Sequence, residues 1–429
     1  MLDINLIRKS PDLVKKNLEK KFQKDMLPWV DDLIEKDKEF VKTKFEAEQL
    51  KKRKNELSAE INKLKKEKKD AAKLLDEAKK IPQQLIELEA QQKELQEKIN
   101  YHLMRLPNIL HDSVPIGKDD TENVEIKKWG APRAFDFEPK GHGELLEELG
   151  VGDFKRSAKV AGAGFYYLRG PFALLNQALI RFALDFLIKK GYTYVEPPLM
   201  MHRKTYEGVV DLKDFESVMY KVENEDLFLI ATSEHPLVGQ FQDESLSEED
   251  LPVKMAGYSM CFRKEIGAHG VDTKGLFRTH QFNKVEQIIL CKPEDSYKYY
   301  DELLENSEAL FRALELPYRI LEICSGDCSS IKAKSADLEV WMPKQKAYKE
   351  LGSLTNCTDY QARRLGIKCI DKEGNRRVLH TLNNTAIATS RALVAIAENY
   401  QNKDGSITIP SVLVPYMNGI KKIEKIRSF

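Results

Sequence analysis

Charged and aromatic side chains alternate along one short stretch of the chain, and their spacing indicates that they act together. Residues 261–287 read CFRKEIGAHGVDTKGLFRTHQFNKVEQ. Arg263 and Glu265 are two residues apart, and after a glycine-bearing segment Phe282 and Glu286 again share one parity. Because side chains alternate between the two faces of a strand, each set points to one side. The stretch therefore predicts a hairpin that directs an arginine, two carboxylates and an aromatic ring to one place.

These residue types suit the binding of a nucleotide and an amino group. Phe282 can stack on a flat base, and Arg263 can hold a phosphate through two parallel hydrogen bonds. Glu265 or Glu286 can accept hydrogen bonds from amino groups. The same types also form ordinary cross-strand salt bridges and core contacts, so the hairpin alone leaves both interpretations open.

Three further segments carry polar side chains, which we expect at a strand end, on a turn and at the start of a helix, respectively. They are Thr232 and Glu234 in ATSEHPL, Glu350 and Ser353 in KAYKELGSLTNCTDYQARR, and Asn383, Thr385 and Arg391 in HTLNNTAIATSRALVAIAENYQ. The acid and hydroxyl of the second segment can ligate Mg²⁺, whereas Thr385 can equally be a helix N-cap. Neither GxxxxGK[ST] nor GxGxxG occurs, so the sequence supports neither a P-loop nor a dinucleotide fold.

Composition bounds the class of protein. The 429 residues are 42% hydrophobic and 32% charged, which suits a globular chain with more than one domain. The net charge is +1, so binding to nucleic acid must come from a local patch. We find no signal peptide and no apolar run long enough to span a bilayer. The six cysteines lack CxxC spacing, and we interpret them as reduced thiols in a cytoplasmic protein.

The first hundred residues carry heptads, which are typical of a coiled coil. The heptad positions are Leu33, Phe40, Ala47 and Ile61 with Leu50, Leu57 and Leu64 in a first run, and Leu74, Ile81, Leu88 and Leu95 with Ala78, Leu85, Ile99 and Leu106 in a second. Lys54 and Gln92 are the exceptions, and a polar break lies near Lys68 to Asp70. We expect an antiparallel helical hairpin with helices of about 30 residues, projecting about 45 to 50 Å. Pro82 should kink the second helix or mark a late start.

The expected tip of this hairpin is basic. Residues 51–80 hold twelve Lys or Arg and six Asp or Glu, a net charge of +6. Such a charge is common on a solvated helix surface, but it also suits contact with a phosphate backbone. The candidate RNA-binding residues are Lys51, Lys52, Arg53 and Lys54.

Beyond the heptads the pattern predicts an α+β fold. Pro, Gly and Asp turns follow Leu106, and apolar helices and β-branched strands come after them. Strand runs with helices set to one side indicate an antiparallel β-sheet flanked by helices. We expect a helical domain over 1–110, a linker over 111–139 and the main domain over 140–429.

Several long motifs resemble those of class II aminoacyl-tRNA synthetases. FRKEIGAHGVDTKGLFRTHQFNKVEQ resembles their motif 2, TLNNTAIATSRALVAIAENYQ their motif 3, and KKGYTYVEPPL, with Pro198, their motif 1. The combination of TSE at 232–234, THQFNKVE at 279–286 and ELGSLTNCTDYQARR at 350–364 is similar to seryl-tRNA synthetases, as is the helical arm. The chain reads NNTAIATSR where bacterial members typically read NGSGLAxGR, closer to the archaeal and eukaryotic branch.

The resemblance implies a class II synthetase fold, an ATP-dependent ligase activity and a set of site residues. It implies that Arg263 and Arg391 are catalytic and that Glu350 and Ser353 hold Mg²⁺. The implied ATP-binding residues are Arg263, Glu265, Arg278, Thr279, Phe282, Glu350, Leu351, Ser353 and Arg391. The implied serine-binding residues are Thr232, Glu234, Arg263, Glu286, Asn383 and Thr385.

The resemblance also implies partners. They are L-serine, ATP, tRNA(Ser) held by the arm, and a second copy of the chain bound through YTYVEPPLM, with no role for DNA or a membrane. Selenocysteine tRNA stays open as a second substrate. Two other functions stay open too: an enzyme that charges carrier proteins with amino acids, whose members lack the long arm, and a non-enzymatic RNA-binding scaffold. A non-enzymatic scaffold does not account for the residues at the ATP and serine positions.

Overall fold

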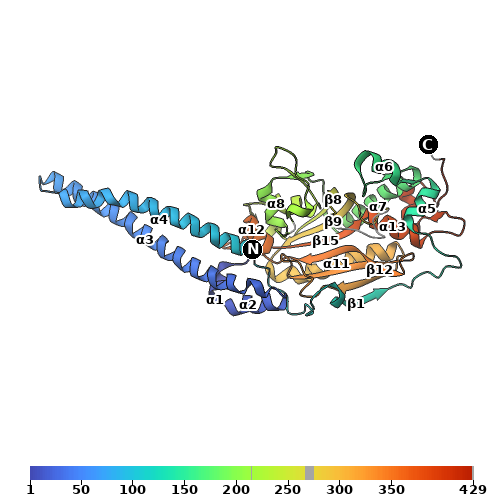
Figure 1. Ribbon diagram of the computed structural model, residues 1–429, viewed down its shortest axis with the longest axis horizontal. Helices are drawn as coiled ribbons and strands as arrows, with labels where there is room; N and C mark the ends of the chain where they lie inside the picture. The colour runs from blue at the N-terminus through green and yellow to red at the C-terminus, as the bar shows by residue number, and fades with distance from the viewer. Residues whose placement is uncertain (214, 266–274, 428–429) are drawn as a thin grey trace. The chain divides into compact units, whose positions relative to one another are not determined.

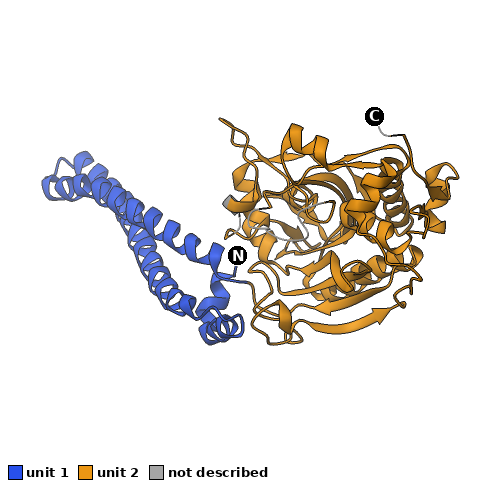
Figure 2. Cartoon of the chain, turned by 45° about the vertical axis from the view of Figure 1, so that its right-hand side comes forward, with its two compact units in different colours: residues 1–107 blue, residues 108–429 orange. Residues whose placement is uncertain are grey.

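The chain divides into two compact units, which we describe separately (Figure 2). The structure is a computed structural model that describes residues 1–213, 215–265 and 275–427. Unit 1 is Met1–Pro107 and unit 2 is Asn108–Phe429. Gly267 and Gly270 of the expected hairpin loop lie outside the described residues.

Unit 1 is helical, and its two long helices form the predicted antiparallel hairpin (Figure 1). Its elements are α1 (Ile4–Lys9), α2 (Pro11–Lys20), η1 (Lys24–Met26), α3 (Leu27–Lys66) and α4 (Ala72–Arg105). Side chains at the heptad positions form one buried cluster between α3 and α4, with Leu57, Ile61, Ile81 and Leu85 among its members. At 40 residues, α3 is longer than expected and extends about 60 Å at 1.5 Å per residue.

Details of the hairpin explain the irregularities in its sequence pattern. The turn lies where the polar break predicted it, with Lys68 at a φ of 52°. Pro82 does not mark a late start, because α4 begins ten residues earlier at Ala72. The Gln92 amide donates to the Thr43 carbonyl oxygen at 3.1 Å, so this polar heptad residue is satisfied across the helix interface.

Unit 2 is built on an eight-stranded sheet, which confirms the α+β prediction. In spatial order its strands are β1 (Val124–Trp129), β10 (Tyr318–Glu322), β11 (Lys334–Met342), β12 (Ala347–Asn356), β15 (His380–Ala388), β9 (Gln281–Cys291), β8 (Val253–Phe262) and β4 (Thr193–Val195). Neighbours pair antiparallel except β4 and β8, which are parallel. The predicted hairpin is β8 and β9, in which Cys261 lies opposite Phe282.

The longer helices of unit 2 pack on the sheet through the largest core cluster. They are α7 (Gly170–Lys189), α11 (Ser296–Ala313) and α13 (Thr389–Asn399). On β9 the Gln287 amide donates to the Leu303 carbonyl oxygen of α11, at 3.4 Å. Glu286 must therefore point to the opposite face of the sheet, since adjacent strand residues alternate.

Short elements surround the sheet. The helices are α5 (His142–Leu149), α6 (Phe154–Ala161), α8 (Arg203–Val209), α9 (Phe215–Val218), α10 (Glu234–Gly239), α12 (Tyr360–Leu365), η2 (Asp120–Glu122), η3 (Glu248–Asp250), η5 (Pro293–Asp295) and η6 (Ser411–Met417). The strands are β2 (Gly152–Asp153), β3 (Tyr167–Leu168), β5 (Met200–Met201), β6 (Phe228–Leu229), β7 (Ser245–Ser247), β13 (Lys368–Ile370), β14 (Arg376–Val378), β16 (Ile407–Thr408) and β17 (Lys422–Ile423). All six cysteines are free and buried.

Two features differ from the sequence expectations. Within the described residues, α7 is one helix whose length and composition would suffice to cross a membrane, whereas we expected no such run. More than half of it is buried, and its apolar side chains belong to the core of unit 2, which accounts for its composition.

The expected linker over 111–139 contains β1, an edge strand of the sheet. Val124 and Ile126 alternate with Glu125 and Lys127, but the alternation is short and ends at Lys128, so the strand escaped prediction.

Candidate active site

A cavity of about 510 Å³ opens on the face of the sheet opposite α11. Strands β9, β11, β12 and β15 contribute residues to its floor, and residues of α10 and α13 contribute to its walls. Every residue expected to bind ATP or serine lines it: Thr232, Glu234, Arg263, Glu265, Arg278, Thr279, Phe282, Glu286, Glu350, Leu351, Ser353, Asn383, Thr385 and Arg391. The strand register thus brings together segments that are up to about 160 residues apart in the sequence.

A buried charged cluster lies at the centre of the floor. The Lys284 ammonium is 2.7 Å from a Glu286 carboxylate oxygen, and the two side chains are only 7% and 2% exposed. The Thr385 hydroxyl, directly opposite on β15, donates to the Glu286 oxygens at 3.3 and 3.4 Å. The register shifts by one residue after Thr385, leaving Ala386 as the extra residue of a β-bulge. Bulges often re-aim side chains beside active sites, and this one flanks the hydroxyl.

Glu234 forms the neighbouring wall of the cavity and is held by two amides. The Asn383 and Gln361 side chains each donate to one carboxylate oxygen of Glu234 at 3.0 Å. Burial and the charge of Glu286 raise the pKa of Glu234 to about 7. The Thr232 hydroxyl accepts from the Glu234 backbone N–H at 3.2 Å, so TSE forms one tight turn. This arrangement can recognise a small polar group beside Glu286.

The other end of the cavity carries cationic and aromatic groups. The Arg263 guanidinium lies 5.2 Å from the centroid of the Phe282 ring. Arg278 donates to a Glu265 carboxylate oxygen at 3.3 Å. The Thr279 hydroxyl is buried without a hydrogen-bond partner among the described residues. A flat ring stacked on Phe282 would therefore lie beside both a guanidinium and a carboxylate.

Arg391 connects β12 with the helix α13. Its guanidinium donates to the Glu350 carbonyl oxygen at 2.7 Å and to the Glu350 carboxylate at 3.1 Å. It also lies 5.1 Å from the Phe277 ring centroid. Burial opposes ionisation of Glu350, but the charge of Arg391 holds the pKa of Glu350 below its usual range. Leu351 is the extra residue of a second β-bulge, between β11 and β12.

Two cavity residues near Ser353 were not expected from the sequence. Asp337 lies opposite Ser353 in the β11–β12 register, and its Oδ1 is buried without a hydrogen-bond partner in the described parts of the chain. Burial and the charge of Glu350 raise the pKa of Asp337 to about 7. Lys332 donates to the Ser353 hydroxyl at 3.4 Å. Glu350, Ser353 and Asp337 together offer the hard oxygen ligands that Mg²⁺ prefers.

Comparison with known proteins decides the family. The model of the seryl-tRNA synthetase N-terminal domain matches residues 1–110, and that of the class II core domain (G, H, P, S and T) matches residues 219–400. The serine–tRNA ligase of Methanocella arvoryzae is 56% identical over 423 residues, which cover 98% of this chain and 100% of that protein. The chain belongs to the seryl-tRNA synthetase family.

Solved structures of this family agree with the fold. The seryl-tRNA synthetase of Pyrococcus horikoshii, complexed with ATP, is 46% identical with a TM-score of 0.95, and the alignment covers 100% of both chains. The cytoplasmic serine–tRNA ligase of Naegleria fowleri, in complex with AMP, is 33% identical with a TM-score of 0.89 and covers 100% of this chain and 99% of that one. These comparisons confirm the family resemblance and the predicted fold class.

The four candidate RNA-binding residues lie on α3 of unit 1. Arg53 is engaged with Glu77, donating to both carboxylate oxygens at 2.8 and 3.0 Å, and Lys51 is 3.0 Å from Glu89. Lys52 and Lys54 are exposed. Arg53 therefore already connects α3 to α4, whereas Lys52 and Lys54 point to solvent.

For several residues in or next to the cavity, the sequence patterns indicated no role. Gln361, Lys332, Asp337 and Phe277 all line it or hold residues that do. Gln361 belongs to the motif ELGSLTNCTDYQARR, so its place in that motif is the signal that could have found it. Asp337 and Lys332 lie outside every motif, and only the register of β11 with β12 brings Asp337 opposite Ser353.

Proposed function

We propose that this protein activates L-serine with ATP to form seryl-adenylate and transfers the seryl group to the 3′ end of tRNA(Ser). One observation carries the proposal: the residues expected to bind ATP and those expected to bind serine line a single cavity, in a chain of the seryl-tRNA synthetase family. ATP enters as a substrate, as the complex of the Pyrococcus horikoshii relative with ATP supports.

The adenine and the α-phosphate would occupy the hairpin end of the cavity. Phe282 would stack on the adenine and Glu265 would accept from its amino group, with Thr279 beside it. Arg263, which lies 5.2 Å from the Phe282 ring, would contact the α-phosphate and the serine carboxylate. Arg278 and Arg391 would contact phosphates further along the triphosphate. Their guanidinium groups stabilise charge at a transferring phosphoryl centre by position and field.

The serine would bind at the Glu286 end. Its ammonium would contact Glu286, and its hydroxyl would lie against Thr232, Glu234, Asn383 and Thr385. A site that hydrogen-bonds a substrate hydroxyl can reject the analogue without it by about 10⁴-fold, because the buried polar groups are left unpaired. The serine carboxylate is ionised at neutral pH, since an α-carboxyl group titrates near ~3.5, so its attack on the α-phosphorus needs no general base.

Glu350 and Ser353 would hold Mg²⁺, with Asp337 as a nearby oxygen donor. The described residues contain no group of three or more His, Cys, Asp or Glu side chains that could form a protein cage. That is the usual situation for Mg²⁺, which binds through one or two carboxylates together with substrate phosphates. When bound, it would neutralise phosphate charge during the transfer.

The helical arm of unit 1 would hold the tRNA. The net charge of +6 over residues 51–80 suits a phosphate backbone. An arm of this length is placed to follow an RNA helix by its shape and backbone, since A-form grooves expose few base edges. Because aminoacyl-tRNA is consumed where proteins are made, we also place the protein in the cytoplasm.

We further propose that the protein is a homodimer through the segment YTYVEPPLM. Met200 and Leu199 of that segment are 43% and 39% exposed, and Ile188 of α7 nearby in sequence is 44% exposed. Apolar exposure of this kind is typical of obligate interfaces. Light scattering at micromolar concentration should give twice the chain mass of 49.3 kDa, and the mass of a single chain would contradict the proposal.

Two assays test the activity. ATP–pyrophosphate exchange should depend on serine among the amino acids, and the purified protein should then acylate tRNA(Ser). If the protein exchanges pyrophosphate with serine but transfers the seryl group only to a carrier protein, then the acceptor is that carrier protein and not tRNA. No exchange with any amino acid would reject the enzymatic function.

A further inference from the structure

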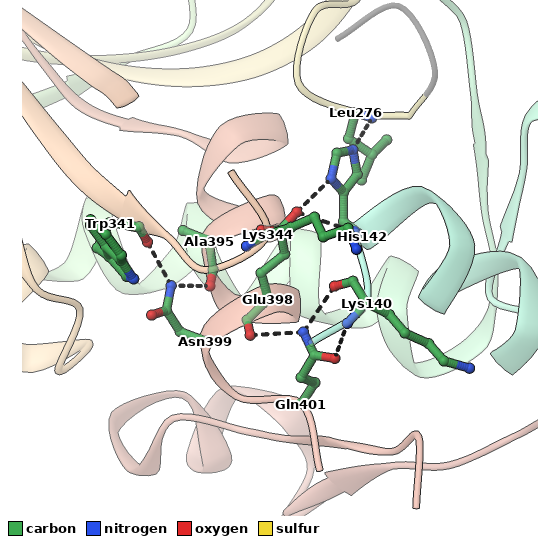
Figure 3. A network of polar contacts seen from close by, with 9 residues as sticks. All are labelled: Lys140, His142, Leu276, Trp341, Lys344, Ala395, Glu398, Asn399 and Gln401. Atoms are coloured by element: carbon green, nitrogen blue, oxygen red, sulfur yellow. Dashed lines mark hydrogen bonds and ion pairs between the residues drawn. The ribbon is translucent and has the colours of Figure 1, made fainter. Parts of the chain in front are cut away.

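His142, at the first position of α5, joins Leu276, in the middle of the motif 2 segment, to the end of helix α13 (Figure 3). Its Nε2 accepts a hydrogen bond from the Leu276 backbone N–H at 3.1 Å. Its Nδ1 is 3.0 Å from a carboxylate oxygen of Glu398, on α13. Both side chains are largely enclosed, at 12% and 4% exposure. Neither residue lines the cavity. Glu398 lies near the end of the motif 3 segment, and His142 lies outside every motif quoted above.

The contacts determine the protonation of the imidazole ring. A backbone N–H can only donate, so Nε2 must carry the lone pair. The proton of the neutral ring is then on Nδ1 and donates to the Glu398 carboxylate. Glu398 also accepts from the His142 and Lys344 backbone N–H groups, each at 3.2 Å. Glu398 therefore selects the tautomer that can accept from Leu276.

The backbone before His142 is held by the same end of α13. The Gln401 amide donates to the Lys140 carbonyl oxygen at 3.0 Å, and its oxygen accepts from the Lys140 N–H at 2.8 Å (Figure 3). Gly275 leaves room for the ring, since a Cβ at that position would lie 2.2 Å from the His142 Nε2. Gly275 also has a φ of +119°, which L side chains rarely adopt. The approach of the ring to the chain therefore depends on a glycine.

The segment that His142 holds crosses the cavity. The other end of this segment is fixed at His280, whose N–H donates to the Gly164 carbonyl oxygen and whose carbonyl accepts from the Arg263 N–H. Between the two anchors lie three residues, and all of them line the cavity: Phe277, Arg278 and Thr279. The Leu276 N–H is thus bound by a side chain, that of His142, and a substitution can remove this anchor. The anchor at His280 consists of backbone hydrogen bonds, which a substitution leaves in place.

Helix α13 connects this anchor to the arginine of the site. Glu398 lies seven residues after Arg391, two helical turns further along the same face. Arg391 contacts the Phe277 ring, and Glu398, two turns further along α13, holds His142 against the neighbouring residue Leu276. The helix thus sets the distance between Arg391 and the segment that carries Phe277 and Arg278.

We propose that His142 is a positioning residue for ATP, which keeps Phe277, Arg278 and Thr279 in register with Arg391 through its hydrogen bond to the Leu276 N–H. The inference rests on the proposed function, because the proposed function assigns ATP to the end of the cavity that Phe277, Arg278 and Thr279 line. His142 acts through the backbone and touches neither substrate. Its loss should weaken ATP binding and leave serine binding nearly unchanged.

Two substitutions separate the two bonds of the ring. In His142→Asn the amide lies where Nδ1 was, so it can donate to Glu398 but cannot reach Leu276. In His142→Gln the amide oxygen can reach the place of Nε2 and accept from the Leu276 N–H. A net hydrogen-bond loss of typical size predicts that His142→Asn raises the KM for ATP about three- to tenfold in pyrophosphate exchange. His142→Gln should stay within about twofold of the unsubstituted protein, and the KM for serine should change little in both.

The matched control is His102→Asn, since His102 makes a comparable bond at 2.7 Å to Asp32 within unit 1. It should leave both KM values unchanged. A rise in the KM for ATP with His142→Gln as large as that with His142→Asn would overturn the proposal, and so would equal rises for ATP and serine. Should His142→Asn not fold, His142→Ala, which also lacks an acceptor for the Leu276 N–H, takes its place in the comparison with His142→Gln.

Direct ATP binding keeps this inference separate from the proposed function. Calorimetry with ATP alone should show a dissociation constant weaker by about three- to tenfold for His142→Asn and nearly unchanged for His142→Gln. Absence of serine-dependent exchange in the unsubstituted protein would reject the proposed function without touching this comparison. Equal ATP affinity in all three proteins would reject the role of His142.

Discussion

Replacement of Glu286 by glutamine tests the most enclosed charge of the site. Glutamine keeps the shape of the side chain and removes its charge. The Lys284 ammonium, which is 2.7 Å from the carboxylate in the unsubstituted protein, then loses that counter-ion. The Thr385 hydroxyl keeps an acceptor in the amide oxygen. The substitution therefore removes one interaction from the protein and, if serine binds as proposed, one from the substrate.

The magnitudes follow from the burial of the pair. Removing one partner of a buried ion pair typically costs about 3 to 5 kcal/mol, and since the amide oxygen can still accept from lysine we expect about 3 kcal/mol of lost unfolding free energy. A hydrogen bond between charged groups contributes about 1.5 to 3 kcal/mol. At about 1.4 kcal/mol per tenfold, the KM for serine should rise about 10- to 100-fold. The KM for ATP should rise less than about threefold, because ATP makes no contact with Glu286 in the proposed arrangement.

The assay is steady-state pyrophosphate exchange with each substrate varied in turn, beside urea unfolding of the apo protein. Glu308→Gln is the matched control: Glu308 is also buried, and it binds Lys127 and the Tyr318 hydroxyl, each at 2.8 Å, outside the cavity. It should lose stability and keep both KM values. Equal rises in the two KM values for Glu286→Gln would refute the assignment and make Glu286 a structural residue.

Three further outcomes are expected. Arg263→Ala should abolish pyrophosphate exchange with little change in melting temperature. Arg263→Lys should also lack exchange, since an ammonium cannot form two parallel hydrogen bonds to a phosphate. Near-normal exchange in either folded variant would reject the role of Arg263 in binding the α-phosphate. Residues 38–96 can be deleted and the gap closed with a short turn, because the remaining helix ends lie side by side: His102 is 2.7 Å from Asp32. The deletion should spare pyrophosphate exchange and remove most tRNA charging. Full charging would show that the arm does not select the tRNA. Burial and Glu286 raise the pKa of Glu234 to about 7, above the ordinary value of 4.5. Between these two pH values the folded state therefore binds more protons than the unfolded state. The unfolding free energy of the apo protein should fall as pH rises from about 4.5 to 7. Glu234→Gln should flatten that part of a pH series of unfolding curves, and an unchanged slope would contradict the cause.

Strand periodicity alone predicts much of the cavity. Phe282 and Glu286 lie on one face of β9, and Arg263 and Glu265, just beyond the end of β8 at Phe262, line the same cavity. The heptads similarly predict the packing of α3 against α4, because burial at those positions depends only on local spacing. These features are local in sequence, and that is why a pattern is enough.

Features that depend on pairing between distant segments were not predictable. The bulges at Ala386 and Leu351 place Thr385 and Glu350, but a bulge leaves no clear sign in a single strand. His142 is 134 residues from Leu276, and only the folded chain shows that they touch. The strand β1 was missed for a different reason: it is an exposed edge, and its apolar alternation is limited to Val124 and Ile126.

Amino-acid-dependent ATP–pyrophosphate exchange, measured with each amino acid in turn, tests the central claim most directly. The cavity places Glu286, Thr385 and Glu234 together at one end and Arg263 with Phe282 at the other, so exchange should require ATP and serine together. We predict strong exchange with serine, none above background with alanine, and loss of the serine signal in Glu286→Gln at subsaturating serine. Exchange that is absent with serine, or equally strong with alanine, would contradict the account.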